Sequence, residues 1–233
     1  MHPILTILHS FTTPTVSSTE IKQKNENLVI QVGNIELNSE YWYSVKAATI
    51  RKLIKYAKPA EFGWKDQTLL DKSVRDTWKI SANLVKIDEG SWNKTLQPVI
   101  ETIRLRMGIA TGIKAQLQDL LIYEPGQFFS RHRDSEKCDG MVATLIVVLP
   151  IQHEGGNLVV EHQDEITIYY SDTKGQNISF FAFYADCLHE VTTVNKGYRV
   201  ALTYNLVLQP SNDGVTPKFD TKQELSRNHS APR

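Results

Sequence analysis

Four side chains in the second half of the sequence have the types and spacing of a metal site. His132 and Asp134 are separated by one residue, and His189 and Arg199 follow much later in the chain. On an extended strand, residues i and i+2 point to the same face, so His132 and Asp134 can bind one ion from one side. Two imidazoles and one carboxylate on one face of an octahedral ion leave its opposite positions open. The sequence therefore predicts an open metal site built from His132, Asp134 and His189.

The identity of the metal stays open at this level. His-x-Asp alone is a weak pattern, because the chain holds 7 His and 26 Asp plus Glu residues. Structural zinc sites are usually closed and rich in cysteine, which disfavours structural zinc, whereas catalytic zinc remains an alternative to Fe(II). Arg199 favours a metal site that also takes an oxo acid, because a planar guanidinium can bind a carboxylate through two parallel hydrogen bonds.

The surroundings of these residues make the pattern specific. Four motifs flank the potential ligands in a fixed order: 123–129 (YEPGQFF), 155–158 (GGNL), 183–191 (FYADCLHEV) and 197–204 (GYRVALTY). With these motifs, residues 116–208 resemble the catalytic domain of 2-oxoglutarate- and Fe(II)-dependent oxygenases. Within that family they are most similar to the prolyl 4-hydroxylase-like branch. The resemblance is strong over this region and loose over the N-terminal half.

The resemblance implies roles for individual residues and a set of cofactors. The three potential ligands would hold Fe(II), Arg199 would bind the distal carboxylate of 2-oxoglutarate, and O2 would be the other reactant. Tyr123 would offer its phenol to the co-substrate. Thr203 lies four residues beyond Arg199 and faces the same way on a strand, so its hydroxyl could bind the same carboxylate. Core packing for Tyr123 and an ordinary strand position for Thr203 stay open as alternatives. Ascorbate could support such an enzyme.

Several other polar residues near the motifs are expected to stay outside the metal site. His153 and His162 flank the Gly155-Gly156 turn and are expected to be solvated rather than to bind metal. Arg131 and Glu190 each adjoin a potential ligand, so on a strand they point to the opposite side.

The composition is that of an ordinary globular protein. A chain of 233 residues is long enough for one sizeable core. Lys plus Arg equals Asp plus Glu at 26 each, so the strongly basic footprint of a nucleic-acid-binding protein is missing. Two cysteines, Cys138 and Cys187, fit a reducing compartment, although a bridge between them stays open. Without a long apolar run or a secretory leader, we expect a cytoplasmic protein with no membrane span.

The order of expected elements indicates an α+β protein. Its core would be a double-stranded β-helix, or jelly roll, buttressed by N-terminal helices. Core strands are expected where Val, Ile, Leu, Tyr and Phe gather between turn residues, over 118–123, 141–150, 157–162, 165–170, 177–184 and 198–208.

The N-terminal half is expected to be more mixed. Short strands are expected before residue 40, a helix over 42–57, and a helix-to-strand transition over 66–78. A second helix would run from an N-cap at Ser91 to about Met107, with Leu105 among its buried residues. We therefore expect a supporting region over 1–110, the oxygenase core over 111–208 and a polar, flexible tail over 209–233.

Three hypotheses for the function remain. The first is a dioxygenase that hydroxylates a protein or peptide side chain, with proline as the favoured target and succinate and CO2 as co-products. The second uses the same chemistry on a small molecule or nucleobase, and the third is a jelly roll that binds a metal or ligand without turnover. The complete triad and Arg199 favour an enzyme. A peptide groove would need exposed aromatic residues, and core packing competes for each candidate: Trp42, Tyr43, Trp64, Trp78 and Trp92. The sequence does not indicate the oligomeric state.

Overall fold

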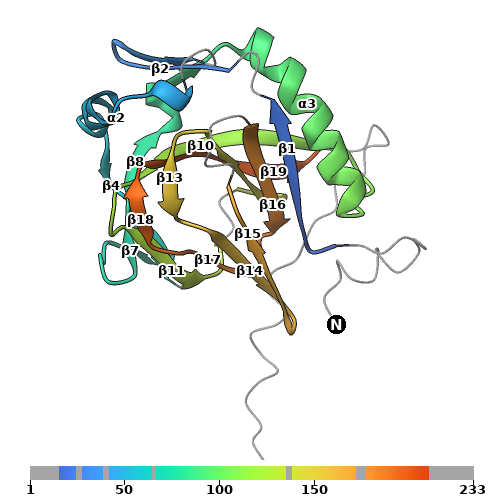
Figure 1. The fold of residues 1–233 in the computed structure, drawn as a ribbon. Coiled ribbons are helices and arrows are strands. Elements are labelled where there is room, and N and C mark those ends of the chain that lie inside the picture. Colours follow the sequence, from blue (N-terminus) through green and yellow to red (C-terminus); the bar gives the residue numbers. More distant parts are fainter. Residues whose placement is uncertain are drawn as a thin grey trace, which may run out of the picture.

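Two antiparallel sheets form the centre of the protein in the computed structural model (Figure 1). The structure describes residues 16–24, 28–38, 42–64, 67–134, 138–171 and 177–209. The larger sheet has seven strands in the order β1 (Ser18–Lys24), β16 (Asn177–Tyr184), β12 (Met141–Val148), β19 (Arg199–Leu208), β10 (Ile113–Tyr123), β8 (Trp78–Ser81) and β4 (Lys58–Pro59). The smaller sheet has five, in the order β15 (Glu165–Tyr169), β14 (Leu158–His162), β17 (Leu188–Val191), β11 (Phe128–His132) and β7 (Arg75–Asp76).

The six core strands predicted from the sequence all form, as β10, β12, β14, β15, β16 and β19. The largest difference is in β10, which begins at Ile113 rather than at residue 118. β12 ends at Val148, two residues early, because Pro150 cannot donate to a strand ladder. The predicted tail lies outside the described residues beyond residue 209.

Alternation along β19 shows how one strand builds both faces of the larger sheet. Val200 and Leu202 belong to the outer hydrophobic cluster, which also contains side chains of the N-terminal region. Ala201 belongs to the inner cluster, which contains side chains from both sheets. Arg199 and Thr203 share the parity of Ala201, so they face the space between the sheets.

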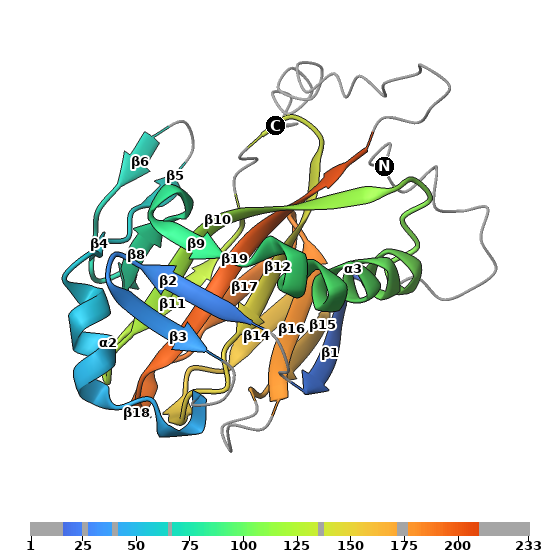
Figure 2. The same ribbon diagram turned by 90° about the horizontal axis from the view of Figure 1, so that it is seen from above.

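A helix and a small sheet cover the outer face of the larger sheet (Figure 2). The helix is α3 (Glu89–Arg106), whose Trp92 ring stacks on Phe180 with centroids 6.0 Å apart and donates a hydrogen bond to the Tyr204 hydroxyl at 3.1 Å. The small sheet has the order β3 (Ile35–Asn38), β2 (Val29–Val32) and β9 (Val85–Ile87). Leu28 and Ile30 are fully buried beneath it.

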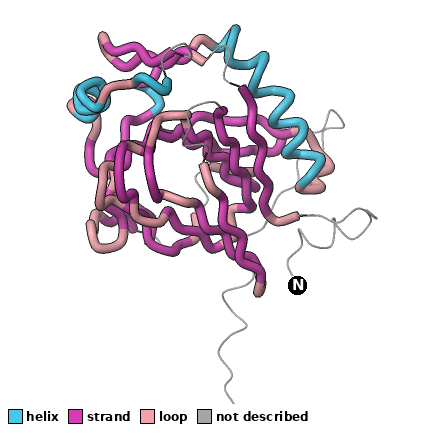
Figure 3. Tube along the Cα trace, viewed as in Figure 1, coloured by secondary structure: helices cyan, strands magenta, loops and turns pink. Residues whose placement is uncertain are grey.

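The expected buttress of N-terminal helices is not supported, because the described structure is mostly sheet with few helices, and its N-terminal region contributes many short strands beside α3 (Figure 3). Two short strands, β5 (Phe62–Trp64) and β6 (Gln67–Leu69), form a hairpin, and η2 (Ala82–Leu84) is a single 3-10 turn. The stretch 66–78, predicted to pass from helix to strand, holds strands and turns and no helix among its described residues. No described helix is long and apolar enough to cross a membrane.

The two predicted helices form with different limits. The stretch 42–57 contains η1 (Trp42–Ser44) and α2 (Ala47–Ile54), separated because Lys46 is extended. α3 is capped by Asp88, whose carboxylate accepts from the Gly90 amide at 3.2 Å, so the prediction of Ser91 as N-cap was wrong. Leu105 is 62% exposed rather than buried. The end of α3 near Met107 agrees with the prediction, because Gly108 adopts a left-handed φ of 68°.

Candidate metal and co-substrate site

The three predicted metal ligands lie together between the sheets. His132 on β11 pairs with His189 on β17, and their ring centroids are 4.0 Å apart. The Asp134 carboxylate lies 3.9 Å from His132 Nε2 and 3.7 Å from His189 Nε2. The ligand atoms lie within 4.8 Å of one another, so one ion could contact all three. β11 ends at His132, so Asp134 reaches the site from just beyond the strand, not from the strand itself as predicted.

Backbone carbonyls orient both imidazoles. His132 Nδ1 lies 2.8 Å from the Ser130 carbonyl oxygen, and His189 Nδ1 lies 3.2 Å from that of Cys187. A carbonyl only accepts hydrogen bonds, so each Nδ1 carries the hydrogen and each Nε2 keeps its lone pair. Both lone pairs are therefore on the nitrogens nearest Asp134, which is the tautomer that a metal site requires.

Burial keeps the His132 imidazole in the neutral form, which can bind a cation. Burial and, next, the neighbouring His189 imidazole lower the pKa of His132 to about 3, although Asp134 opposes the shift. The His132 imidazole is consequently neutral near pH 7 and can act as a ligand. Phe129 stacks on His132 with centroids 3.5 Å apart, and Phe183 packs 4.4 Å from His189. These rings restrict water around the ligands.

The Thr144 hydroxyl contacts the carboxylate of the candidate ligand Asp134 and was not found from the sequence. It donates a hydrogen bond to Asp134 Oδ2 at 2.6 Å. Thr144 is the one polar residue in β12, MVATLIVV, and its side chain is buried. A lone hydroxyl in an apolar strand was the available signal. The bond orients Asp134 toward the two imidazoles.

Removing this hydroxyl is expected to weaken the metal site. Thr144→Val keeps the shape of the side chain but leaves Asp134 without that donor. We expect an affinity for Mn(II), measured by titration of the metal, that is about 10- to 100-fold weaker. Thr144→Ser keeps the donor and should stay close to the parent protein. Equal affinities in the valine and serine variants would show that the hydrogen bond does not support metal binding.

Arg199 lies buried on the inner face without a partner for two of its nitrogens. It is 1% exposed, and within the described residues Nε and Nη2 have no hydrogen-bond partner. Burial lowers the pKa of Arg199, but a guanidinium stays protonated in proteins. Its central carbon lies 5.4 Å from the centroid of the Tyr123 ring, which is also buried. A buried, unpaired charge is costly, so this arrangement suits a site that receives an anion.

The other predicted co-substrate residues lie on the same inner face. Tyr123 pairs with Arg199 across β10 and β19 and packs against the guanidinium. The Thr203 hydroxyl donates to the Asp119 carbonyl at 3.3 Å, so it already has a backbone partner. Thr203 could still accept a hydrogen bond from another group, because a hydroxyl has two lone pairs.

Gly156 makes room for Arg199. It has a φ of +66°, and a Cβ placed there would lie 2.7 Å from Arg199 Cδ and 2.9 Å from Val194 Cγ2. The Gly155-Gly156 turn is thus not only a tight turn, as the sequence indicates, but also the surface against which the arginine side chain lies.

Adding one methyl group at Gly156 is expected to disturb the arginine. Gly156→Ala should weaken 2-oxoglutarate binding by about 10- to 100-fold, as expected when an anchoring group is displaced by about 1 Å. Gly126→Ala is the matched control. Gly126 also has a positive φ, of 90°, but a Cβ there would meet nothing within 4 Å. Calorimetric titration of both variants separates backbone strain from the clash with Arg199; equal losses in both would contradict the role of Gly156.

Two histidines expected to be solvated have other environments. His153 is buried at 2% exposure, so that prediction was wrong. It lies on β13 (His153–Gly155), which pairs with β18 (Val194–Gly197). His162 Nδ1 lies 3.5 Å from the Cys187 thiol. Both cysteines are free, and burial followed by the charge of Asp186 raises the pKa of Cys187 to about 12.

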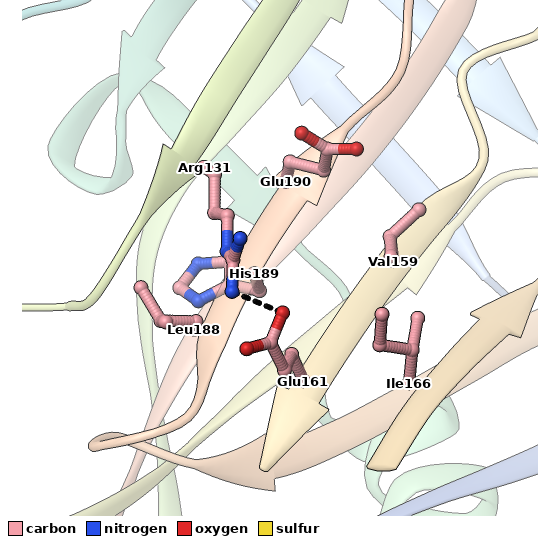
Figure 4. Close-up of a pocket in the computed structure, with 7 residues that line it drawn as sticks. All are labelled: Arg131, Val159, Glu161, Ile166, Leu188, His189 and Glu190. Carbon is pink, nitrogen blue, oxygen red and sulfur yellow. Dashed lines mark ion pairs between the residues drawn. The ribbon is translucent and has the colours of Figure 1, made fainter. Parts of the chain in front are cut away.

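The smaller sheet carries a hollow whose lining includes His189 together with residues of the neighbouring strands (Figure 4). Arg131 forms an ion pair with Glu161 there. Arg131 and Glu190, which were predicted to point away from their ligand neighbours, both line this hollow. The hollow is lined by Arg131, Val159, Glu161, Ile166, Leu188, His189 and Glu190.

Comparison with known proteins agrees with this site. Residues 119–207 match the sequence model of a family described as the 2OG-Fe(II) oxygenase superfamily, where 2OG is 2-oxoglutarate. The match confirms the predicted resemblance over this region. Fe(II), 2-oxoglutarate and O2, the cofactors predicted from the motifs, are those of the matching family. No curated protein matches the sequence significantly.

Two solved structures are similar to this chain at low sequence identity. A prolyl-4-hydroxylase from Pseudomonas putida is 15% identical, with a TM-score of 0.50 over 79% of this chain and 94% of that chain. A Trichoplax adhaerens prolyl hydroxylase, solved with a peptide fragment of the hypoxia inducible factor oxygen degradation domain, is also 15% identical, with a TM-score of 0.48 over 78% of this chain and 83% of that chain. The first likeness supports the jelly-roll fold.

Proposed function

With the match of residues 119–207 to the 2OG-Fe(II) oxygenase superfamily as the premise, we propose that this protein is an Fe(II)- and 2-oxoglutarate-dependent dioxygenase. We further propose that it hydroxylates a protein or peptide side chain, with proline as the favoured target. His132, Asp134 and His189 would hold the metal. Arg199 would bind the distal carboxylate of 2-oxoglutarate, next to Tyr123, with Thr203 as a further polar group on the same face.

The observation that carries this proposal is that Nε and Nη2 of Arg199 are buried and have no hydrogen-bond partner among the described residues. Thr144, which holds Asp134, pairs with Asn205 on β19, whereas Arg199 begins the same strand. The metal ligands and the guanidinium therefore lie at different depths between the two sheets. An elongated dicarboxylate suits this arrangement, because one end can chelate the metal while the other end meets Nε and Nη2 of Arg199.

Fe(II), when bound with 2-oxoglutarate and O2, supplies the oxidation in which 2-oxoglutarate becomes succinate and CO2 while a substrate C–H becomes C–OH. The chain's own residues bind and orient the reactants. Thr144 and the two backbone carbonyls fix the ligand atoms, Arg199 fixes the far end of the co-substrate, and Phe129 and Phe183 restrict water beside the imidazoles.

The choice of a peptide and of proline rests on the order of motifs around the triad. Two of the aromatic candidates for a peptide groove are excluded, because Trp42 and Trp92 are 1% and 2% exposed. Trp78 is half-buried, and its indole donates to Glu124 at 2.7 Å. The side chains of Tyr43 and Trp64 lie outside the described part of the structure. Trp78 also packs against the outer cluster, on the face of the larger sheet away from the candidate site, so none of the three candidates with described side chains faces the space between the sheets.

Substrate class can be tested with a library of unstructured peptides, each paired with a version in which alanine replaces proline. The full chain with Fe(II), 2-oxoglutarate and ascorbate should add the mass of one oxygen atom to some proline peptides and to none of their alanine partners. Succinate should form in proportion to the hydroxylated product. Peptide-independent succinate formation alone would support the oxygenase chemistry while counting against the peptide proposal. Equal oxidation of both members of a pair would count against proline.

A further inference from the structure

His153 is a buried imidazole with one free nitrogen beside the co-substrate site. Its Nδ1 lies 2.7 Å from the Ile151 carbonyl oxygen and therefore carries the hydrogen. Its Nε2 is buried, and within the described residues it has no hydrogen-bond partner. A buried polar atom without a partner costs free energy, so it indicates a group that the site receives.

Strand pairing places His153 close in space to the start of the strand that carries Arg199. His153 on β13 pairs with Gly197 on β18, and Arg199 follows two residues later. Gly156 lies just beyond the end of β13, and a Cβ placed there would lie 2.7 Å from Arg199 Cδ, so this part of the chain packs against the arginine side chain. The charge of Arg199 also contributes, after burial, to lowering the pKa of His153 to about 4. The imidazole is therefore neutral near pH 7 when no anion is present.

Three unpartnered polar atoms thus lie in this buried region: Nε and Nη2 of Arg199 and Nε2 of His153. A carboxylate can satisfy the two guanidinium nitrogens, because both are donors. It can also satisfy His153, provided that Nε2 gains a hydrogen and becomes a donor. An entering carboxylate balances the charge of Arg199, so it raises the proton affinity of the neighbouring imidazole.

We propose that His153 is a second recognition group for the distal carboxylate of 2-oxoglutarate, alongside Arg199, and that it takes up a proton from solvent when the co-substrate binds. This inference rests on the proposed function. The proton goes to Nε2 of His153. None is released by 2-oxoglutarate, because both of its carboxyl groups are already ionised near pH 7.

The proposal predicts a direction for the pH dependence of binding. The complex holds one more proton than the free protein, so the affinity for 2-oxoglutarate falls as pH rises through the pKa that His153 has in the complex. The limiting slope is about tenfold per pH unit. Arg199 is the charged group that acts on His153, and the Tyr123 ring lies 5.4 Å from the central carbon of that guanidinium. On the ribbon itself, Glu154 and Lys196 are exposed and pair with each other at 3.3 Å.

Calorimetry on the full chain loaded with Mn(II) tests the proposal. 2-Oxoglutarate is titrated at about pH 7 in two buffers with different protonation enthalpies. The difference in measured enthalpy gives the number of protons taken up. We expect net uptake with 2-oxoglutarate and none with oxalate, which can chelate the metal but has no distal carboxylate to reach Arg199. His153→Gln, which cannot be protonated, should lose the uptake, and its affinity should no longer change between about pH 6 and about pH 8.

The possible outcomes separate this proposal from the function on which it rests. Tight binding of 2-oxoglutarate without proton uptake in the parent protein would overturn the role of His153 and leave the oxygenase proposal intact. Uptake that persists in His153→Gln, or that also accompanies oxalate, would assign the proton to another group and overturn the proposal. No binding of 2-oxoglutarate to the metal-loaded protein would contradict the proposed function itself. The oxalate comparison uses the parent protein alone, so it decides the matter even if the variant does not fold.

Discussion

Replacing His189 with alanine is expected to abolish the metal-dependent conversion of 2-oxoglutarate to succinate. Loss of a group that merely supports a ligand costs about 10- to 100-fold in affinity or activity, so loss of a ligand should cost well over 100-fold. His189 is 5% exposed, and its Nε2 faces Asp134 because the Cys187 carbonyl holds Nδ1. Alanine would leave the site with two of its three candidate protein ligands and would remove the ring that packs against Phe183.

The matched control for this variant is His162→Ala. His162 lies at the end of β14, the neighbour of β17, and contacts the Cys187 thiol. Its removal therefore shows how much a disturbance of the packing next to His189 lowers activity or metal affinity by itself. Succinate formation and Mn(II) affinity should both be lost in His189→Ala and largely kept in His162→Ala. Similar activity in His189→Ala and in the parent protein would show that His189 is not a metal ligand.

Replacing Arg199 with alanine is expected to weaken 2-oxoglutarate binding by about 100-fold or more. Truncating one partner of a buried, hydrogen-bonded charge pair costs about 2–5 kcal/mol, and each 1.4 kcal/mol corresponds to about tenfold. The affinity for 2-oxoglutarate should fall while the affinity for the metal should not change. The reason is that Arg199 lies on the larger sheet, apart from the candidate metal ligands. Mn(II) affinity in Arg199→Ala should therefore match that of the parent protein.

Two comparisons make the result specific to the geometry of the guanidinium. Arg199→Lys keeps the charge but not the two parallel donors, so its affinity for 2-oxoglutarate should lie between those of the parent and the alanine variant. Oxalate has no distal carboxylate, so its affinity should be similar in all three proteins. A loss of oxalate binding equal to that of 2-oxoglutarate would place the effect at the metal, contrary to the role given to Arg199.

The candidate metal ligands, which the structure brings together, could be picked out from the sequence because few residue types can perform this chemistry. The prediction from the spacing of His132 and Asp134 assumed that both lie on one strand. Asp134 instead lies just beyond β11, and its carboxylate still lies close to both imidazoles. Arg199 was recognisable because a charged residue opens an apolar strand. These are local features, and their interpretation did not depend on knowing the neighbouring strands.

The supporting residues could not be predicted because their partners are brought together by long-range pairing. Thr144 is next to Asp134 only because β12 lies opposite the end of β11, and nothing in MVATLIVV indicates that neighbour. His153 is buried where β13 pairs with β18, near the start of the strand that carries Arg199, whereas its place beside two glycines suggested an exposed turn. Burial of a histidine depends on what covers it, and the sequence does not contain that information locally.

The errors in the N-terminal half have a similar origin. Ser91 and Asp88 are both good N-cap residues, and the structure uses the earlier one, which starts α3 before Ser91. Leu105 lies near the end of the helix, where its side faces away from the sheet, and it is 62% exposed. Between residues 58 and 87 the strands are two to four residues long, which is too short for periodicity to identify them.

Visible absorption of the anaerobic protein with Fe(II), before and after addition of 2-oxoglutarate, tests the central claim most directly. Chelation of the iron by the 2-oxo acid at the triad should produce a weak charge-transfer band in the parent protein. The band should be absent in His132→Ala and should require more 2-oxoglutarate in Arg199→Ala. Absence of the band at saturating 2-oxoglutarate, in folded protein that has bound iron, would contradict the assignment of this site to a 2-oxoglutarate-dependent oxygenase.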